Sequence, residues 1–524
     1  KTGSWPTSGE LTSGNARRKG GLPGSQATLV SLIETVVLAL FVPASMVGFP
    51  SLLWGEGPVH WALLATLAVA GAKFAALSAA PVRRPHEMVV WLFIYVFLGL
   101  APLVQDSTGI LPGTVPWIRS PYVAPATAVI LAGCLVFILG LNLGSRSQRR
   151  PRMIRRKAVD PRRVQILTVI TLLLASYYIF TVGISGVTAP RATAELIRKE
   201  LWPEVQGAIL YASVIMGLLV SVLAQLQLRA ERQRNGGPSS PGVLLLTTVV
   251  LVLVANPIST ARYVFGTVAL ALAAGLGAYA TPSRFRIMHV ASLVGMLAVF
   301  PVLDTFRTSL EASVSPQDLT SALTSGDFDA FAQIVNTIDY TENSLDHKWL
   351  MQGVGVLLFW VPRSMWSGKP LDTGVAVGTY MGYGYTNLSA PLWAELFVNG
   401  GWSLLVIGMA AFGYWVRRAD VVVEASLRYA GRPSVLGCIL PFYLLILLRG
   451  SLLQAMSYLT VAILASLFVS ATPSRTTQAL SAHPTAAAGA SAAGRRVART
   501  GPPPPVTPRT PTANRRWGTR SCTP

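Results

Sequence analysis

Charged residues are scarce in this chain, and acidic residues are the scarcest among them. Only 12% of its 524 residues are Asp, Glu, Lys or Arg, about half the share found in an ordinary soluble domain. Hydrophobic residues make up 52%, and the mean hydropathy is +0.50. Such a composition cannot cover a water-soluble protein with polar surface, so it excludes a soluble fold and indicates an integral membrane protein.

Cysteine and histidine are too few and too scattered to suggest a metal or redox site. Of the three cysteines, Cys134 and Cys438 lie in apolar runs and Cys522 lies close to the last residue. No pair has the spacing of a zinc site or of a disulfide framework. We therefore expect neither a metal ion nor a cofactor.

Positive charge is present in excess, with 43 basic against 22 acidic residues and a formal net charge of +21. The basic residues cluster in short segments between apolar runs, which is typical of cytoplasmic loops beside anionic lipid headgroups. The partner that this pattern predicts is the lipid bilayer. Nucleic acid, which binds basic patches on soluble surfaces, is not indicated.

Apolar runs of roughly the length that crosses a bilayer recur along the chain. Twelve membrane spans are predicted, at residues 28–49, 61–80, 88–104, 122–143, 164–184, 207–228, 243–255, 263–281, 288–303, 392–415, 434–448 and 452–471. The predicted fold is therefore an all-α polytopic membrane bundle with about 12 transmembrane helices. One large extracytoplasmic loop, residues 304–391, separates the ninth span from the tenth.

The positions of Lys and Arg predict the orientation of these spans. Nine basic residues between 146 and 163 mark a cytoplasmic loop. Counting spans outward from this loop places four more basic groups on the same side, at 83–84, 229–234, 284–286 and 417–418. Both termini are then cytoplasmic, and the loop 304–391, which is rich in Asp and Glu, lies outside.

The sequence divides into three predicted parts. Residues 1–26 form a cytoplasmic N-terminal arm, 27–471 the membrane domain, and 472–524 a basic tail rich in Pro, Ala and Thr. The tail cannot bury enough apolar area to fold, so we expect it to be disordered and cytoplasmic. Within the large loop, residues 349–361 are apolar but too short to span, which predicts an interfacial or re-entrant helix.

Arginines on the outer side are informative because a charge near the bilayer is costly unless it is paired or solvated. Five are predicted there: Arg191, Arg262, Arg307, Arg363 and Arg449. Some have plain structural explanations, since Arg307 can pair with Asp304, Arg191 can be an ordinary loop charge, and Arg262 and Arg449 can be anchors that snorkel toward water. Otherwise, these arginines can bind an anionic substrate.

The segment FWVPRSMWSGKP (359–370) is the strongest candidate for an anion site. Arg363 and Lys369 lie in it together with two prolines and two tryptophans, one of them Trp366. This composition predicts a rigid basic and aromatic turn at the membrane surface. It suits a lipid-linked phosphate, because Arg binds phosphate oxygens bidentately and Lys adds a point charge.

Glu395 is a carboxylate at the start of the tenth predicted span, in PLWAELFVNGGW. Placed beside an apolar wall, it could act as a general base for an acceptor hydroxyl. It could equally be a helix-start carboxylate that the helix dipole stabilises. Both interpretations remain open from the sequence.

Seven segments, in this order, resemble the bacterial O-antigen polymerases, the Wzy-like family of oligosaccharide repeat-unit polymerases. They are WLFIYVFLGLAPLVQ (91–105), the arginine of NPISTARYVFG (262), FPVLDTFR (300–307), GDFDAF (326–331), FWVPRSMWSGKP (359–370), LSAPLWAELFVNGGW (388–402) and LLRGSLL (447–453). The resemblance covers residues 88–471.

The resemblance implies a glycosyltransferase in the bacterial cytoplasmic membrane that joins undecaprenyl-diphosphate-linked oligosaccharide repeat units at the outer face. A chain-length regulator and a repeat-unit flippase are the further partners it implies. A glycan ligase of similar architecture would use the same donor chemistry and differ in its acceptor. A polysaccharide transporter or flippase is the alternative of a different class, and it would require broken helices with charges near the bilayer midplane.

Overall fold

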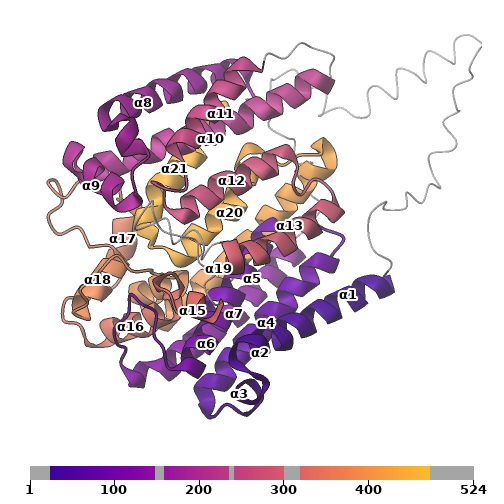
Figure 1. Cartoon of the computed structure of the whole chain (residues 1–524), viewed down its shortest axis with the longest axis vertical. Helices are drawn as coiled ribbons and strands as arrows, with labels where there is room; N and C mark the ends of the chain where they lie inside the picture. The colour runs from indigo at the N-terminus through magenta and orange to yellow at the C-terminus, as the bar shows by residue number, and fades with distance from the viewer. Residues whose placement is uncertain (1–23, 148–158, 235–240, 300–318, 472–524) are drawn as a thin grey trace, which may run out of the picture. The chain divides into compact units, whose positions relative to one another are not determined.

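The computed structural model describes residues 24–147, 159–234, 241–299 and 319–471, and the regular secondary structure in these ranges is helical, without any β-strand. The predicted tail 472–524 and most of the N-terminal arm lie outside them. The longer helices are α1 (Gly24–Val36), α4 (Gly57–Ala79), α5 (Pro85–Phe93), α7 (Val123–Arg146), α8 (Pro161–Val187), α9 (Arg191–Leu201), α10 (Glu204–Arg234), α11 (Gly242–Val254), α12 (Arg262–Leu276), α13 (Pro282–Val294), α16 (Ala330–Asn343), α19 (Leu392–Ala430), α20 (Val435–Arg449) and α21 (Leu452–Val469) (Figure 1).

Short helices connect or extend these elements. They are η2 (Val37–Phe41), α2 (Val42–Val47), α3 (Phe49–Trp54), η3 (Ile94–Leu100), α6 (Ala101–Thr108), η4 (Ser120–Tyr122), η5 (Gly295–Val299), α15 (Leu319–Leu323), η6 (Gly326–Phe328), α17 (Met351–Leu357) and α18 (Thr373–Tyr380). A helix, α17, is present within the predicted segment 349–361, although it is shorter than the apolar run, and its interfacial or re-entrant placement stays a prediction.

Eight helical stretches in the described ranges are long and apolar enough to cross a membrane. Three shorter apolar helices, α11, α12 and α20, coincide with further predicted spans. The ninth predicted span, 288–303, begins within α13 and continues into residues outside the described ranges. The all-helical, multi-pass character of the protein is confirmed, whereas the count of twelve spans stays a prediction.

The stretch Pro85–Thr108, which comprises α5, η3 and α6, is the central helix of the bundle. Its most apolar window is completely buried by the surrounding protein. The reason is visible in its sequence, since an uncharged run of Val, Leu, Phe and Trp is apolar on every side. Gly99 permits α4 to pack closely, because a Cβ atom there would lie 3.0 Å from the Cα of Leu67.

The helices α7 and α19 make the most extensive pairing in the bundle. They cross at small residues: a Cβ at Gly140 would collide with the carbonyl of Ala410, and one at Gly413 with the carbonyl of Phe137. Close backbone contact of this kind is typical of membrane helices, where packing rather than water exclusion drives association. This contact holds α19, which carries Glu395, against the rest of the bundle.

One end of the bundle, here called the basic end, gathers segments that the sequence predicts to be cytoplasmic. Arg83 pairs with Glu424 at 2.8 Å and also donates to the carbonyl of Ala280. Arg417 pairs with Glu87 at 3.0 Å, and His86 contacts Asp420 at 2.8 Å. Segments around 83–87, 280 and 417–424 therefore share one end, as the predicted parity of the spans requires.

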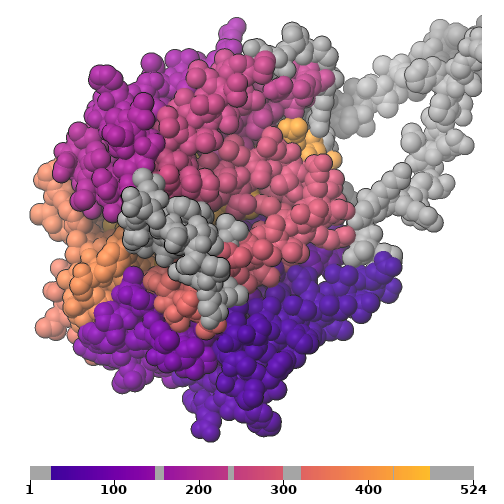
Figure 2. Space-filling model, viewed as in Figure 1, coloured from indigo at the N-terminus to yellow at the C-terminus, as the bar shows by residue number. Residues whose placement is uncertain are grey.

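The opposite end, here called the loop end, is built by residues 319–391, the described part of the predicted large loop. The amide of Gln105 donates to the carbonyl of Leu323 at 2.9 Å. Nearly all of α16 is buried, and it packs against α7, α18 and α19. Figure 2 shows one face of the molecule, where α12 and α13 lie between the N-terminal helices and α8 to α10.

Candidate functional site

The carboxylate of Glu395 lies at the loop end, where three helices start. The helix α19 begins after Pro391, α21 begins after the break at Gly450 and Ser451, and α18 begins at Thr373. Glu395 lies in the first turn of α19 and faces the first residues of both other helices. It is 1% exposed.

Both carboxylate oxygens of Glu395 accept hydrogen bonds from the protein. Oε1 accepts from the hydroxyl of Ser451 and from the backbone N–H of Leu452, each at 3.0 Å. Oε2 accepts from the hydroxyl of Thr373, also at 3.0 Å. The side chain thus joins α18, α19 and α21, and its acceptor capacity is largely used within the protein. The role of base that the sequence suggests for Glu395 stays a prediction.

Asp372 is a second buried carboxylate close to Glu395. Its Oδ1 accepts from the backbone N–H of Gly374 at 3.0 Å, so it caps the N-terminus of α18. Burial raises its pKa to about 6, against the opposing effect of hydrogen bonds from Ser451, Gly374 and neighbouring donors. The sequence analysis counted this residue only among the loop acids, because burial cannot be read from its position.

Arg262 and Arg449 lie side by side at the loop end, and both face carboxylates. Arg262 forms a salt bridge with Asp327. Arg449 contacts Asp329 at 3.2 Å and donates through Nε to the carbonyl of Asp327 at 2.8 Å. The guanidinium of Arg449 also lies 4.9 Å from the ring centre of Tyr263. A substrate phosphate that binds these arginines, as predicted, would therefore have to compete with the carboxylates of Asp327 and Asp329.

These two aspartates come from GDFDAF, the segment 326–331, and act as counter-ions that the sequence analysis did not assign. Asp329 also accepts from the backbone N–H of Ser389 at 3.1 Å. Burial raises its pKa, while Arg449 counteracts that rise. Two acidic residues that flank Phe328 are visible in the sequence, but their spacing gives no indication that they pair with Arg262 or Arg449.

The side chains of Arg363 and Lys369 both stabilise the turn 359–370 by hydrogen bonds to its backbone carbonyls. Arg363 donates to the carbonyl of Lys369 at 2.7 Å and to that of Pro370 at 3.1 Å. Lys369 donates through Nζ to the carbonyls of Phe359 and Val361, at 2.7 and 2.8 Å. The turn is therefore rigid, as its two prolines predict.

Neither cation of this turn forms a salt bridge with a carboxylate in the described ranges. Burial, followed by the nearby Arg363, lowers the pKa of Lys369. The turn also contains exposed apolar side chains, among them Trp360 at 56% and Met365 at 78% exposed. Trp366 contributes backbone bonds, since its carbonyl accepts from the N–H of Lys369 at 3.0 Å.

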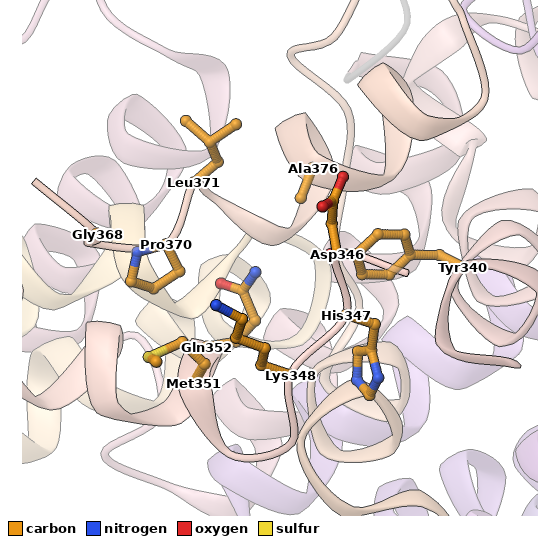
Figure 3. A pocket seen from close by; sticks show the side chains of 10 residues that line it. All are labelled: Tyr340, Asp346, His347, Lys348, Met351, Gln352, Gly368, Pro370, Leu371 and Ala376. Carbon is orange, nitrogen blue, oxygen red and sulfur yellow. The ribbon is translucent and has the colours of Figure 1, made fainter. Parts of the chain in front are cut away.

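A cavity of about 190 Å³ lies beside this turn. Its lining includes Gly368 and Pro370 of the turn, Gln352 of α17, and the polar side chains of Asp346 and Lys348 (Figure 3). The turn and the cavity share a wall, because the carbonyl of Pro370 accepts from Arg363. The cations and the cavity are thus parts of one region.

Arg191 lies elsewhere, at the start of the amphipathic helix α9. Its neighbour Arg198, which sequence reasoning did not select, stacks on the ring of Tyr211 at 4.3 Å and donates to the hydroxyl of Tyr178 at 3.4 Å. Arg307 lies outside the described residues. The structure therefore brings together Arg262 and Arg449 in one cluster and Arg363, Lys369 and Trp366 in another.

A group of three or more His, Cys, Asp or Glu side chains arranged to hold a metal ion does not occur in the described ranges. No family model, curated protein or solved structure matches this chain.

Proposed function

We propose that this chain is a glycosyltransferase of the repeat-unit polymerase type in a bacterial cytoplasmic membrane. In this proposal it has twelve spans, cytoplasmic termini and the loop 304–391 outside. It transfers a growing glycan from undecaprenyl diphosphate to the end of a new lipid-linked repeat unit. The observation that carries the proposal is the turn 359–370, which holds two cations without carboxylate partners in the described ranges and forms one wall of a cavity with polar and apolar lining.

The chemistry of the turn suits a diphosphate leaving group. A guanidinium carries five N–H donors, and Arg363 commits two contacts to backbone carbonyls. The remaining donors can bind phosphate oxygens, and fixed cations stabilise the negative charge that grows as the diphosphate departs. Lys369, held by two carbonyls, retains one N–H donor for the same purpose.

The surroundings of the turn suit a lipid-linked molecule. Leu357, Trp360 and Met365 expose large apolar surfaces around the cations. Exposed apolar groups of this size mark contact with lipid or with an apolar partner. A polyprenyl chain lying in the bilayer would therefore reach the cations without leaving an apolar environment.

The decisive experiment is the conversion of a purified lipid-linked repeat unit into a ladder of longer glycans by the protein in lipid nanodiscs. Both Arg363→Ala and Arg363→Lys should lower activity by roughly tenfold to a hundredfold, the equivalent of about 1.5–3 kcal/mol for a charge-assisted contact. The Lys variant should be nearly as weak as the Ala variant, because an ammonium lacks the planar fork. Arg162→Ala, an exposed arginine at the basic end, is the matched control.

The alternatives separate in the same assay. A ligase would transfer a preformed glycan once, to a different acceptor, and would not form a ladder. A transporter or flippase would leave the repeat unit chemically unchanged. Wild-type protein that forms no ladder, while it moves the lipid-linked unit across a vesicle membrane, would overturn the proposal.

A further inference from the structure

The cavity beside the turn 359–370 has two different walls. One wall is formed by Gly368 and Pro370, behind which Arg363 donates to the Pro370 carbonyl. Figure 3 shows Asp346 on the other side of the cavity, next to Tyr340 and Ala376. A carboxylate therefore faces the cavity from one side, and the turn that holds Arg363 and Lys369 forms the wall on the other.

We propose that this cavity holds the acceptor sugar and that Asp346 is the general base that takes the proton of the acceptor hydroxyl. The inference rests on the proposed function, because it assigns a residue and a subsite to that reaction. It differs from the sequence-based expectation, which placed the base at Glu395.

Asp346 is suited to this role because its carboxylate is free to meet a substrate. Three buried carboxylates at the loop end are occupied: Glu395 by three protein donors, Asp329 by Arg449, and Asp339 by Arg119 at 2.9 Å. Asp346 lines the cavity, is exposed, and forms no salt bridge in the described ranges. A base must lie within hydrogen-bond reach of the proton it takes, and a carboxylate that lines a cavity can meet this requirement without giving up protein donors.

In the proposed reaction, the acceptor oxygen displaces the diphosphate at the anomeric carbon, and the two sides of the cavity have different roles. The acceptor oxygen forms a new bond to that carbon while its proton passes to the carboxylate of Asp346. The bond from the same carbon to the phosphate oxygen breaks, and its electron pair leaves with the diphosphate toward Arg363 and Lys369. Charge is balanced, since the base gains the proton that the acceptor loses, and no further reactant is needed.

The size and polarity of the cavity suit a single sugar ring. Its volume of about 190 Å³ is below the range of roughly 300–1,000 Å³ that is usual for drug-sized ligands. Gln352, Lys348 and Tyr340 supply an amide, an ammonium and a phenol, which can bond to several hydroxyl groups. The acceptor class is thus the terminal sugar of a glycan, with the rest of the chain directed to solvent.

The test compares Asp346→Asn with Glu342→Gln, a matched control at an exposed carboxylate of α16 that does not line the cavity. In the ladder assay, Asp346→Asn should lower kcat by roughly a hundredfold or more, while binding of the lipid-linked unit stays within about twofold of wild type. Added formate should restore part of the activity of Asp346→Ala, because a small carboxylate can enter the vacated space. The control should behave as wild type.

Each other outcome has a definite meaning. A fully active Asp346→Asn would overturn this inference and leave the proposed function standing. Loss of binding in proportion to activity, without formate rescue, would overturn the role of base and show that Asp346 only binds substrate. A wild-type protein that forms no ladder would refute the proposed function, and this inference with it.

Discussion

Replacing Glu395 distinguishes a carboxylate that joins helices from one that performs chemistry. In Glu395→Gln, the amide oxygen can take the place of Oε1 and accept from Ser451 and Leu452. The amide nitrogen then faces the Thr373 hydroxyl, which can rotate and accept. All three contacts survive in this arrangement, so the free energy of unfolding should fall by no more than about 1 kcal/mol, the value of one neutral hydrogen bond.

Glu395→Ala should be far more costly. The buried N–H of Leu452 loses its acceptor, which costs about 1–3 kcal/mol. The space left by the side chain adds a cavity term, so that the total should be about 3–5 kcal/mol. The difference between the two variants, rather than either value alone, carries the information about the hydrogen bonds.

The assay is equilibrium unfolding in mixed micelles, followed by tryptophan fluorescence, together with the ladder assay on each variant. We expect Glu395→Gln to retain most of the activity and Glu395→Ala to lose it through instability. If Glu395→Gln were as unstable as Glu395→Ala, the hydrogen-bond assignment would be refuted. If it were stable yet inactive, Glu395 rather than Asp346 would be the base, as the sequence first suggested.

Three further predictions concern charge and topology. Burial raises the pKa of Asp372 to about 6 from 3.8, so the folded state favours its protonated form. The contribution of Asp372 to stability should therefore fall by on the order of 2–3 kcal/mol between pH 4 and pH 8, and Asp372→Asn should remove that part of the pH dependence of unfolding. Arg449→Ala should destabilise the protein by about 3–5 kcal/mol because it leaves Asp329 buried without its cation, and adding Asp329→Asn in a double-mutant cycle should recover part of that loss. In a Cys522→Ser background, a membrane-impermeant thiol reagent added outside should label Ser325→Cys and not Arg152→Cys, and the reverse pattern would invert the topology.

Helix positions were predictable from this sequence because apolar length is a strong signal in a membrane protein. The predicted span 61–80 corresponds to α4 (Gly57–Ala79), and 434–448 to α20 (Val435–Arg449). Their ends are marked by Pro, Gly and basic residues, which cannot continue an apolar run. The amphipathic helix α9 was not predicted, because its charged side lowers the average hydropathy of the segment below that of a membrane span.

The partners of individual charges were not predictable from the sequence. Arg449 contacts Asp329, which lies 120 residues away in the sequence, and Arg83 contacts Glu424, which lies 341 residues away. Such pairs depend on how helices pack, which local composition does not specify. The contacts within 359–370 were easier to anticipate, since Arg363 and Lys369 bond to carbonyls of their own turn.

The placement of ion pairs in the described ranges supports the proposed transfer chemistry over transport. A transporter that couples to protons or ions needs ionisable groups near the bilayer midplane, usually where helices are interrupted. The helix α19 is interrupted at Gly400 and Gly401, yet neither glycine is flanked by a charged residue, and the ion pair that α19 forms with α5, His86 with Asp420, lies at the basic end. Even the pair of Glu34 and the buried His289, at 2.8 Å, is linked through Ser78 to the last turn of α4 at the basic end. Among the described residues, these ion pairs lie toward the two ends, which agrees with the proposed reaction at one surface of the membrane.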